Sequence, residues 1–421
     1  MKRVLLGSTA LVAAGLVASQ ADAASGLKLG ISGYYRGAIG GEFGSSDSII
    51  ATGGGGFSGS GDFGRQNVSF RQEVRVNFTG STTLDNGITV GVLVGLNAGG
   101  HYQSASNVTA RINRAYMDLS GKFGQIRFGD ANSAYQSMCV GDPGNVTANF
   151  GLNSPNESFS NVGRYSGPAA TGDGGLFLPT AVSGAGTCFG LETRSTKLIY
   201  FSPTFGGFNF AVSYAPSHQR PSGGSGGNGG TNLNSVGSFD QFLSAGINFN
   251  HDFGGITLSA GISGEWALAG QTAPSDNASN SNNKPSMYQA GIQVGFGGGW
   301  AVGASGQYVV NYVNAGYGSA LGASFPSDDA YMITGGGSYT VDAISIGLDG
   351  FYNHYQTQGD STHITAWGVG VNAAYALGPG ISLEGQVAYT QSNNDVGGSA
   401  FFSNVDGENS VEIDFGTAVN F

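Results

Sequence analysis

The chain has 421 residues, of which 10% are charged, and its formal net charge is −11 at pH 7. An acidic chain with so few cations is a poor partner for nucleic acid. Beyond residue 23, no apolar run approaches the roughly 20 residues that a transmembrane helix requires. The composition therefore excludes a helical membrane protein and leaves membrane-spanning strands open.

Residues 1–23 have the three parts of an export signal. Lys2 and Arg3 form a basic start, residues 4–18 carry no charge, and residues 21–23 form a small-x-small cleavage site. A retained helix is disfavoured, because the uncharged run is shorter than the roughly 20 residues that span a bilayer. We therefore expect a mature chain of residues 24–421 in the cell envelope.

Apolar and polar side chains alternate along the mature chain. Val74 and Val76 fall on one parity, whereas Glu73 and Arg75 fall on the other, which predicts a strand with one apolar and one polar face. The same pattern predicts 16 strands, in residues 27–39, 68–78, 88–96, 115–119, 126–128, 198–202, 208–214, 243–249, 256–268, 288–296, 300–312, 331–341, 344–352, 367–377, 381–389 and 410–421.

The connections between these strands also alternate. Seven tight turns, such as "TLDNG" (83–87) and "GPG" (378–380), interleave with eight long polar loops. Turn-forming residues suit hairpins, and this layout is typical of a transmembrane β-barrel. An open sheet edge in lipid would leave backbone groups unpaired. We therefore expect residues 410–421 to pair with the first strand and to place Phe421 at the interfacial aromatic girdle.

Several segments together resemble the general outer-membrane porins of Gram-negative bacteria, in particular those of alphaproteobacterial type. They are the signal "MKRVLLGSTALVAAGL", the first strand "GLKLGISGYYRGAIGG", the hairpins "AYMDLSGKFGQIRFGD" and "KLIYFSPTFGGFNFAVSYAP", and the terminal Phe421. The resemblance implies a homotrimer in outer-membrane lipid. It also implies that the barrel-assembly machinery reads Phe421, and that the third loop, residues 130–192, folds into the lumen as the constriction. The alternative for that loop is an external, unfixed segment.

Cys139 and Cys188 are the two cysteines of the chain, and both lie in the long loop. Export delivers them to an oxidising compartment, so we expect a disulfide. Two thiols without a histidine in the loop do not form a metal site, and no cofactor is expected.

Charge placement carries the main functional signal. By parity, five arginines turn away from the apolar face of neighbouring strands and would form one basic arc of the inner wall. These are Arg36, Arg71, Arg75, Arg114 and Arg127. The long loop contributes the opposing acids Asp130, Asp142, Glu157, Asp173 and Glu192. A basic wall facing an acidic loop resembles the charged constriction of general porins. The alternative is that the arginines merely pair with Glu73 and Asp118.

These features predict a non-enzymatic, water-filled channel for passive diffusion of small hydrophilic solutes and ions. The five histidines have no serine or aspartate partner at a catalytic spacing, which disfavours a hydrolase. Few cations follow Lys197, and the acidic loop offsets the basic arc, so we expect weak cation selectivity. The alternatives are a porin specific for sugars, which inward aromatics such as Tyr34 and Tyr116 would serve, a porin specific for phosphate, and an outer-membrane adhesin.

Overall fold

The computed structural model describes residues 26–44, 68–97, 111–148, 187–188, 190–192, 194–217, 240–269, 284–310, 327–357, 363–394 and 408–421. The expected export signal lies outside these residues, as do Glu157 and Asp173 of the expected loop. Within the described part, no helix is both long enough and apolar enough to cross a bilayer.

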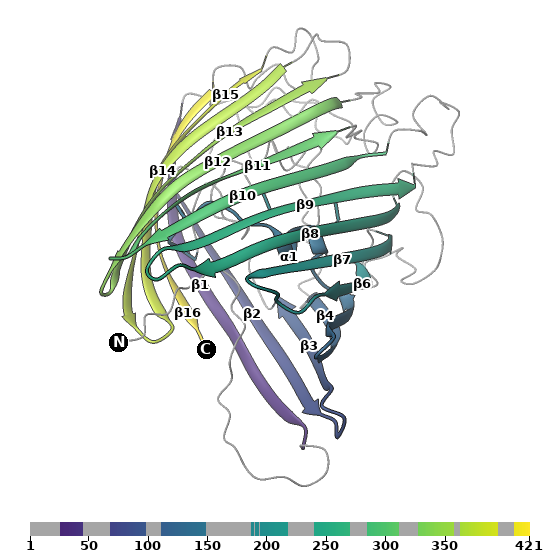
Figure 1. The fold of residues 1–421 in the computed structure, drawn as a ribbon. Coiled ribbons are helices and arrows are strands. Elements are labelled where there is room, and N and C mark those ends of the chain that lie inside the picture. The colour runs from purple at the N-terminus through teal and green to yellow at the C-terminus, as the bar shows by residue number, and fades with distance from the viewer. Residues whose placement is uncertain are drawn as a thin grey trace, which may run out of the picture.

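Sixteen strands form one closed barrel in chain order, and each pairs antiparallel with its neighbours (Figure 1). This confirms the expected all-β, 16-stranded antiparallel barrel. Among the described residues one short helix, α1 (Ala134–Met138), follows β5. The strands are β1 (Lys28–Gly44), β2 (Val68–Thr83), β3 (Thr89–Asn97), β4 (Arg111–Gly121), β5 (Gly124–Asp130), β6 (Thr196–Phe201), β7 (Phe208–Ser217), β8 (Asp240–Asp252), β9 (Thr257–Ala269), β10 (Ser286–Phe296), β11 (Trp300–Val310), β12 (Ser327–Val341), β13 (Ile344–Thr357), β14 (His363–Gly378), β15 (Ile381–Asn394) and β16 (Glu408–Asn420).

Several strands are longer than the sequence predicts, at the ends that lead to the long connections. β15 continues through residues 390–394, and Asn394 still pairs with Ile364 of β14. A backbone hydrogen-bond ladder needs no apolar side chains, so it continues where the apolar alternation has ended. The alternation therefore marks the apolar band of each strand rather than the strand itself.

The barrel closes between β1 and β16, which lie side by side in Figure 1. Tyr35 pairs with Val419 and Ile39 with Phe415. The last residue completes the seam, because Gly33 N donates to Phe421 O at 2.8 Å and Phe421 N donates to Gly33 O at 3.0 Å. The expected pairing of the last strand with the first is therefore confirmed.

The two faces of the wall differ in chemistry. Every strand exposes large apolar side chains on one face, as Val371 (52% exposed) does in β14. The alternate positions carry polar side chains such as Asn372, which is 1% exposed. Because an exposed apolar belt suits lipid and polar side chains suit water, the polar face is the inner face.

The short turn between β14 and β15 shows why a glycine is required there. Gly380 has a φ of 76°, which is costly for other residues. Asn420 N donates to Gly380 O at 2.7 Å, and a Cβ on Gly380 would lie 2.5 Å from Asn420 O. The turn thus also binds the end of β16.

We predict that Gly33→Ala weakens the seam. A Cβ at this position would collide with Arg75 O and would lie 2.9 Å from Cζ of Phe421. Overpacking of this kind costs about 1–3 kcal/mol. Chemical unfolding of the refolded barrel should show this loss. Gly26→Ala is the control, since nothing lies within 4 Å of its Cβ position. Equal unfolding midpoints for the two variants would contradict the role of this contact.

Candidate functional site

The inner faces of β1 and β2 carry a basic cluster around Tyr34. The guanidinium carbons of Arg36 and Arg75 lie 4.1 and 5.2 Å from the centre of the Tyr34 ring. Glu73 forms an ion pair with each arginine, at 3.7 Å from Arg36 Nη1 and 3.4 Å from Arg75 Nη2. The Tyr34 hydroxyl donates to Glu73 Oε1 at 2.5 Å. One carboxylate therefore serves two arginines and a phenol.

A second basic cluster lies on β4 and β5. Arg127 donates to both carboxylate oxygens of Asp118, at 2.7 and 3.0 Å, and lies 4.0 Å above the Tyr116 ring. Arg114 lies within electrostatic range of Arg127 and Arg194, and of Arg75 in the first cluster. Its Nε is buried and finds no hydrogen-bond partner among the described residues. Positive charge is therefore only partly compensated on this arc.

The structure brings together four of the five arginines that the sequence selects, namely Arg36, Arg75, Arg114 and Arg127, on the inner face of β1–β5. The backbone of Arg71 pairs with Ala38 in β1, but its side chain lies outside the described part. The alternative interpretation is also partly right, because Glu73 and Asp118 do pair with arginines. Arg114 belongs to neither pair.

The first part of the long loop, residues 131–148, lies against the polar face of β7–β15. Ala134 N donates to Ser213 Oγ in β7 at 3.0 Å, and Gln289 Nε2 in β10 donates to Val140 O at 2.9 Å. At the far end, Ala148 N donates to Glu384 Oε2 in β15 at 3.0 Å. These strands form the arc of the barrel that the arginines leave free.

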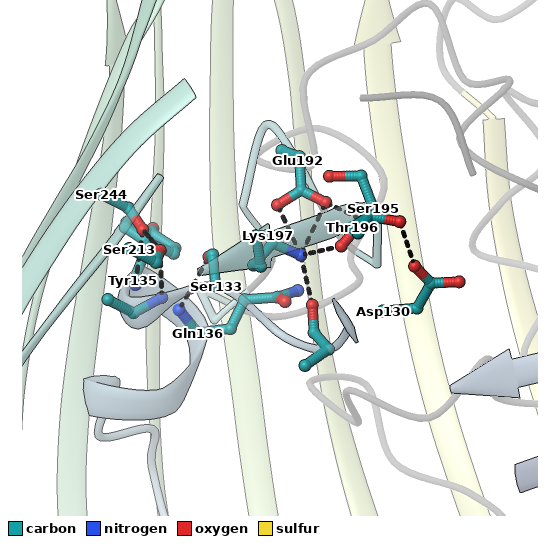
Figure 2. Close-up of polar contacts among 12 residues, drawn as sticks. Asp130, Ser133, Tyr135, Gln136, Glu192, Ser195, Thr196, Lys197, Ser213 and Ser244 are labelled. Carbon is teal, nitrogen blue, oxygen red and sulfur yellow. Dashed lines mark hydrogen bonds and ion pairs between the residues drawn. The ribbon is translucent and has the colours of Figure 1, made fainter. Parts of the chain in front are cut away.

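Lys197 ties the two ends of the loop together at its base. Its Nζ donates to the carbonyl of Ala131, to Ser195 O at 2.8 Å and to Glu192 Oε1 at 2.9 Å (Figure 2). All three ammonium donors are thus used. The side chains of Lys197 and Glu192 are 0% exposed. Glu192 N donates to Glu265 Oε2 in β9 at 3.2 Å, which links this group to the wall. We call the side chains of Lys197, Glu192 and Glu265 together the Lys197 clamp.

A disulfide closes the loop further along. Cys139 and Cys188 are bonded, with 5.6 Å between their Cα atoms, which confirms the expected bridge. In the chain-entropy account, a bridge across 49 residues stabilises by about 4 kcal/mol. Beside it, the Tyr135 hydroxyl donates to Thr187 O at 3.1 Å and accepts from Gln307 Nε2 at 2.8 Å. Burial raises the pKa of the Tyr135 phenol, so the hydroxyl remains a donor.

The described acids of the loop do not form one pore-facing group. Glu192 is buried in the Lys197 clamp, Asp130 accepts from Thr196 Oγ1 at 2.5 Å, and Asp142 accepts from Gly144 N at 3.0 Å. Apart from Glu73 and Asp118, no acid of the wall itself is named from the sequence, although the described part of the inner face carries five more. These are Glu265, Asp349, Glu384, Glu412 and Asp414, all on the inner face and buried. The parity rule that selected the arginines would have selected them too.

A family profile described as Gram-negative porin matches residues 7–395. The chain belongs to the Gram-negative porin family. It is an outer-membrane β-barrel, as expected. No curated protein matches the sequence of this porin.

Solved structures with the same fold cover nearly all of the chain. The outer-membrane channel DcaP of Acinetobacter baumannii is 14% identical, with a TM-score of 0.58 and coverage of 94% of this chain and 98% of that one. The anion-selective porin from Comamonas acidovorans is 15% identical, with a TM-score of 0.55 and coverage of 94% and 100%. The trimer form of OmpT from Vibrio cholerae is 11% identical, with a TM-score of 0.53 and coverage of 95% and 100%.

We predict that Lys197→Met destabilises the porin strongly. The methionine would leave the Glu192 carboxylate buried without its cation, and breaking a buried pair in this way costs about 3–5 kcal/mol. Chemical unfolding of the refolded protein measures the loss. Lys122→Met is the matched control, because Lys122 is exposed in the turn between β4 and β5.

The double variant Lys197→Met with Glu192→Gln distinguishes the effect of an unpaired buried charge from the effect of the altered side-chain shape. It should recover part of the loss, because no unpaired carboxylate remains at position 192. A double variant that is less stable than Lys197→Met would contradict the assignment of the loss to the buried charge.

Proposed function

We propose that this porin forms a water-filled pore through which small hydrophilic solutes and ions diffuse passively. The observation that carries the proposal is the closed barrel of 16 strands with charged side chains on its inner face. Barrels of eight strands fill their interior with side chains, whereas barrels of this size leave an aqueous lumen.

The long loop would narrow this lumen from one side only. Its described part, residues 131–148, is hydrogen-bonded to β7–β15, and the arginine arc occupies β1–β5. A passing solute would therefore meet the loop on one side and guanidinium groups on the other. The narrow, low-dielectric passage would strengthen their field.

The proposal includes weak cation selectivity. Acids outnumber cations on the described inner wall and loop, and buried charges are screened less by salt than exposed ones. The cations are Arg36, Arg75, Arg114, Arg127, Arg194 and Lys197. The acids are Glu73, Asp118, Asp130, Asp142, Glu192, Glu265, Asp349, Glu384, Glu412 and Asp414. The arginine arc opposes this surplus locally, which makes the preference weak.

Reversal potentials across a planar bilayer under a KCl gradient test the selectivity. We expect a small preference for K⁺ that grows as the salt is diluted, because the Debye length then increases. A clear anion preference in dilute salt would contradict the proposal and would show that the arginine arc dominates.

A lumen specialised for sugars has less support. Tyr34 and Tyr116, the two aromatics that would serve this purpose, each lie beneath an arginine side chain, so one face of each ring is already covered. No catalytic role is proposed. The described His251 packs against Phe253, and His354 stacks on Tyr331.

We also propose that the porin is exported by its N-terminal signal, is assembled by the barrel-assembly machinery and forms a homotrimer. Phe421 at the end of the closing seam supports recognition by that machinery. A trimer form is described for the OmpT structure that shares this fold.

A further inference from the structure

The described crossing of the loop follows a row of glycines on the inner wall. Six consecutive strands each place one glycine under residues 138–144. We call this row the glycine track. It consists of Gly246 (β8), Gly261 (β9), Gly291 (β10), Gly303 (β11), Gly336 (β12) and Gly347 (β13).

At each position of the track, an atom of the loop lies within 3 Å of the place that a Cβ would take. A Cβ on Gly246 would lie 2.6 Å from Cβ of Met138, and one on Gly261 would lie 2.7 Å from Met138 O. A Cβ on Gly303 would lie 2.9 Å from Cδ of Pro143. At Gly303 the wall is closer still, since Ile292 O would lie 2.5 Å from the Cβ.

The remaining three glycines meet the loop as closely. A Cβ on Gly336 would lie 2.8 Å from the Cα of Gly144. Cβ atoms on Gly291 and Gly347 would collide with Val140 O and Gly144 O. The loop backbone therefore lies directly on the backbone of the wall.

The track follows one level around the barrel. Gly261 pairs directly with Gly291, and Gly303 pairs directly with Gly336. Between these pairs the position shifts by two residues toward the short turn, since Gly303 is opposite Gln293 rather than Gly291. A regular drift of this kind compensates for the tilt of barrel strands.

The dimensions of the loop match those of the track. An extended chain advances about 3.3 Å per residue, so the six steps from Met138 to Gly144 cover about 20 Å. Met138 O lies over Gly261 in β9 and Gly144 O over Gly347 in β13. The four strand spacings between β9 and β13, at about 4.8 Å each, amount to about 19 Å.

Wall side chains on either side of the glycine track also bind the loop. Ser213 and Ser244 bind the backbone of α1 at one end, and Asn372 binds Gly144 O at 3.1 Å and Val146 N at 2.8 Å at the other. The loop thus covers the glycine track along its length and is hydrogen-bonded to the wall at both ends of it.

We propose that the glycine track sets the width of the pore. The glycines allow the loop to lie closer to the wall by the depth of a side chain. A larger residue at Gly261, Gly291 or Gly347, where the nearest atom belongs to the loop, would therefore lift the loop into the lumen. The inference rests on the proposed channel function and names positioning residues for its size limit. The loop and the wall fit each other closely, because loop backbone lies against wall backbone at four of the six glycines and a loop side chain does so at the other two.

Two alanine variants test the proposal at separate points of the track. Gly261→Ala is the milder one, because its nearest neighbours, Met138 O at 2.7 Å and Cγ2 of Val140 at 2.9 Å, lie less close to the added Cβ. Gly347→Ala meets Gly144 O more severely. The control is Gly91→Ala on the inner face of β3, where the nearest atom is Cβ of Asp118 at an ordinary 3.7 Å. Heat-modifiable gel mobility shows that each variant is a folded barrel.

Single-channel conductance should fall in both track variants relative to wild type and to Gly91→Ala. Conductance equal to that of the control in folded Gly261→Ala and Gly347→Ala would overturn the proposal while leaving the pore itself established. A wild type that does not conduct would instead contradict the proposed function.

Hydrogen exchange at the amide of Ala148 tests the track without reference to conduction. Lifting of the loop in Gly347→Ala should break the bond from Ala148 N to Glu384 Oε2 in β15 and accelerate exchange there. Gly91→Ala should exchange at the wild-type rate. Unchanged protection of Ala148 in folded Gly347→Ala would show that the wall accommodates the methyl group and that the track does not position the loop.

Discussion

The structure depends on one constraint, which is that backbone N–H and C=O groups cannot remain unpaired in lipid. A sheet meets this constraint only when its first and last strands pair, and here β1 and β16 do so up to the final residue, Phe421. Closure then separates two environments. The outer face is apolar around the whole barrel, and the inner face holds the arginines, the acids and the amides. The charge pattern of the lumen is therefore a consequence of strand parity in a closed sheet.

A related constraint, that buried backbone groups need hydrogen-bond partners, governs the loop that crosses the inner wall. Its backbone is not part of the barrel ladder, so wall side chains supply its partners, with Ser213, Gln289 and Asn372 as examples. Its ends are fixed separately. The Lys197 clamp joins the two chain ends at the base, and the bridge between Cys139 and Cys188 closes the segment above it. The disulfide thus closes a segment that lies within the longer segment closed by Lys197. Together the two links restrict the positions of the loop more than either link alone.

The features with a sequence period were predictable, and those without one were not. Alternation in segments such as residues 381–389 predicted the strands and the inward arginines, and export predicted the disulfide. The path of residues 131–148 has no period, so its contacts with β7–β15 could not be foreseen. For the same reason Glu192 was grouped with pore-facing acids, although it is buried against Lys197. The glycine track was hidden as well, because its members are spaced one per strand among the 76 glycines of the chain.

Conductance in the presence of neutral polymers of increasing size tests the central claim most directly, namely that this barrel encloses an open but narrowed aqueous pore. Small polymers should enter the pore and lower its conductance, whereas polymers above a sharp size limit should leave the conductance unchanged. The purified, folded barrel should show this in planar bilayers without any added factor. A folded barrel that carries no current at any salt concentration, or one that admits large and small polymers alike, would contradict the account.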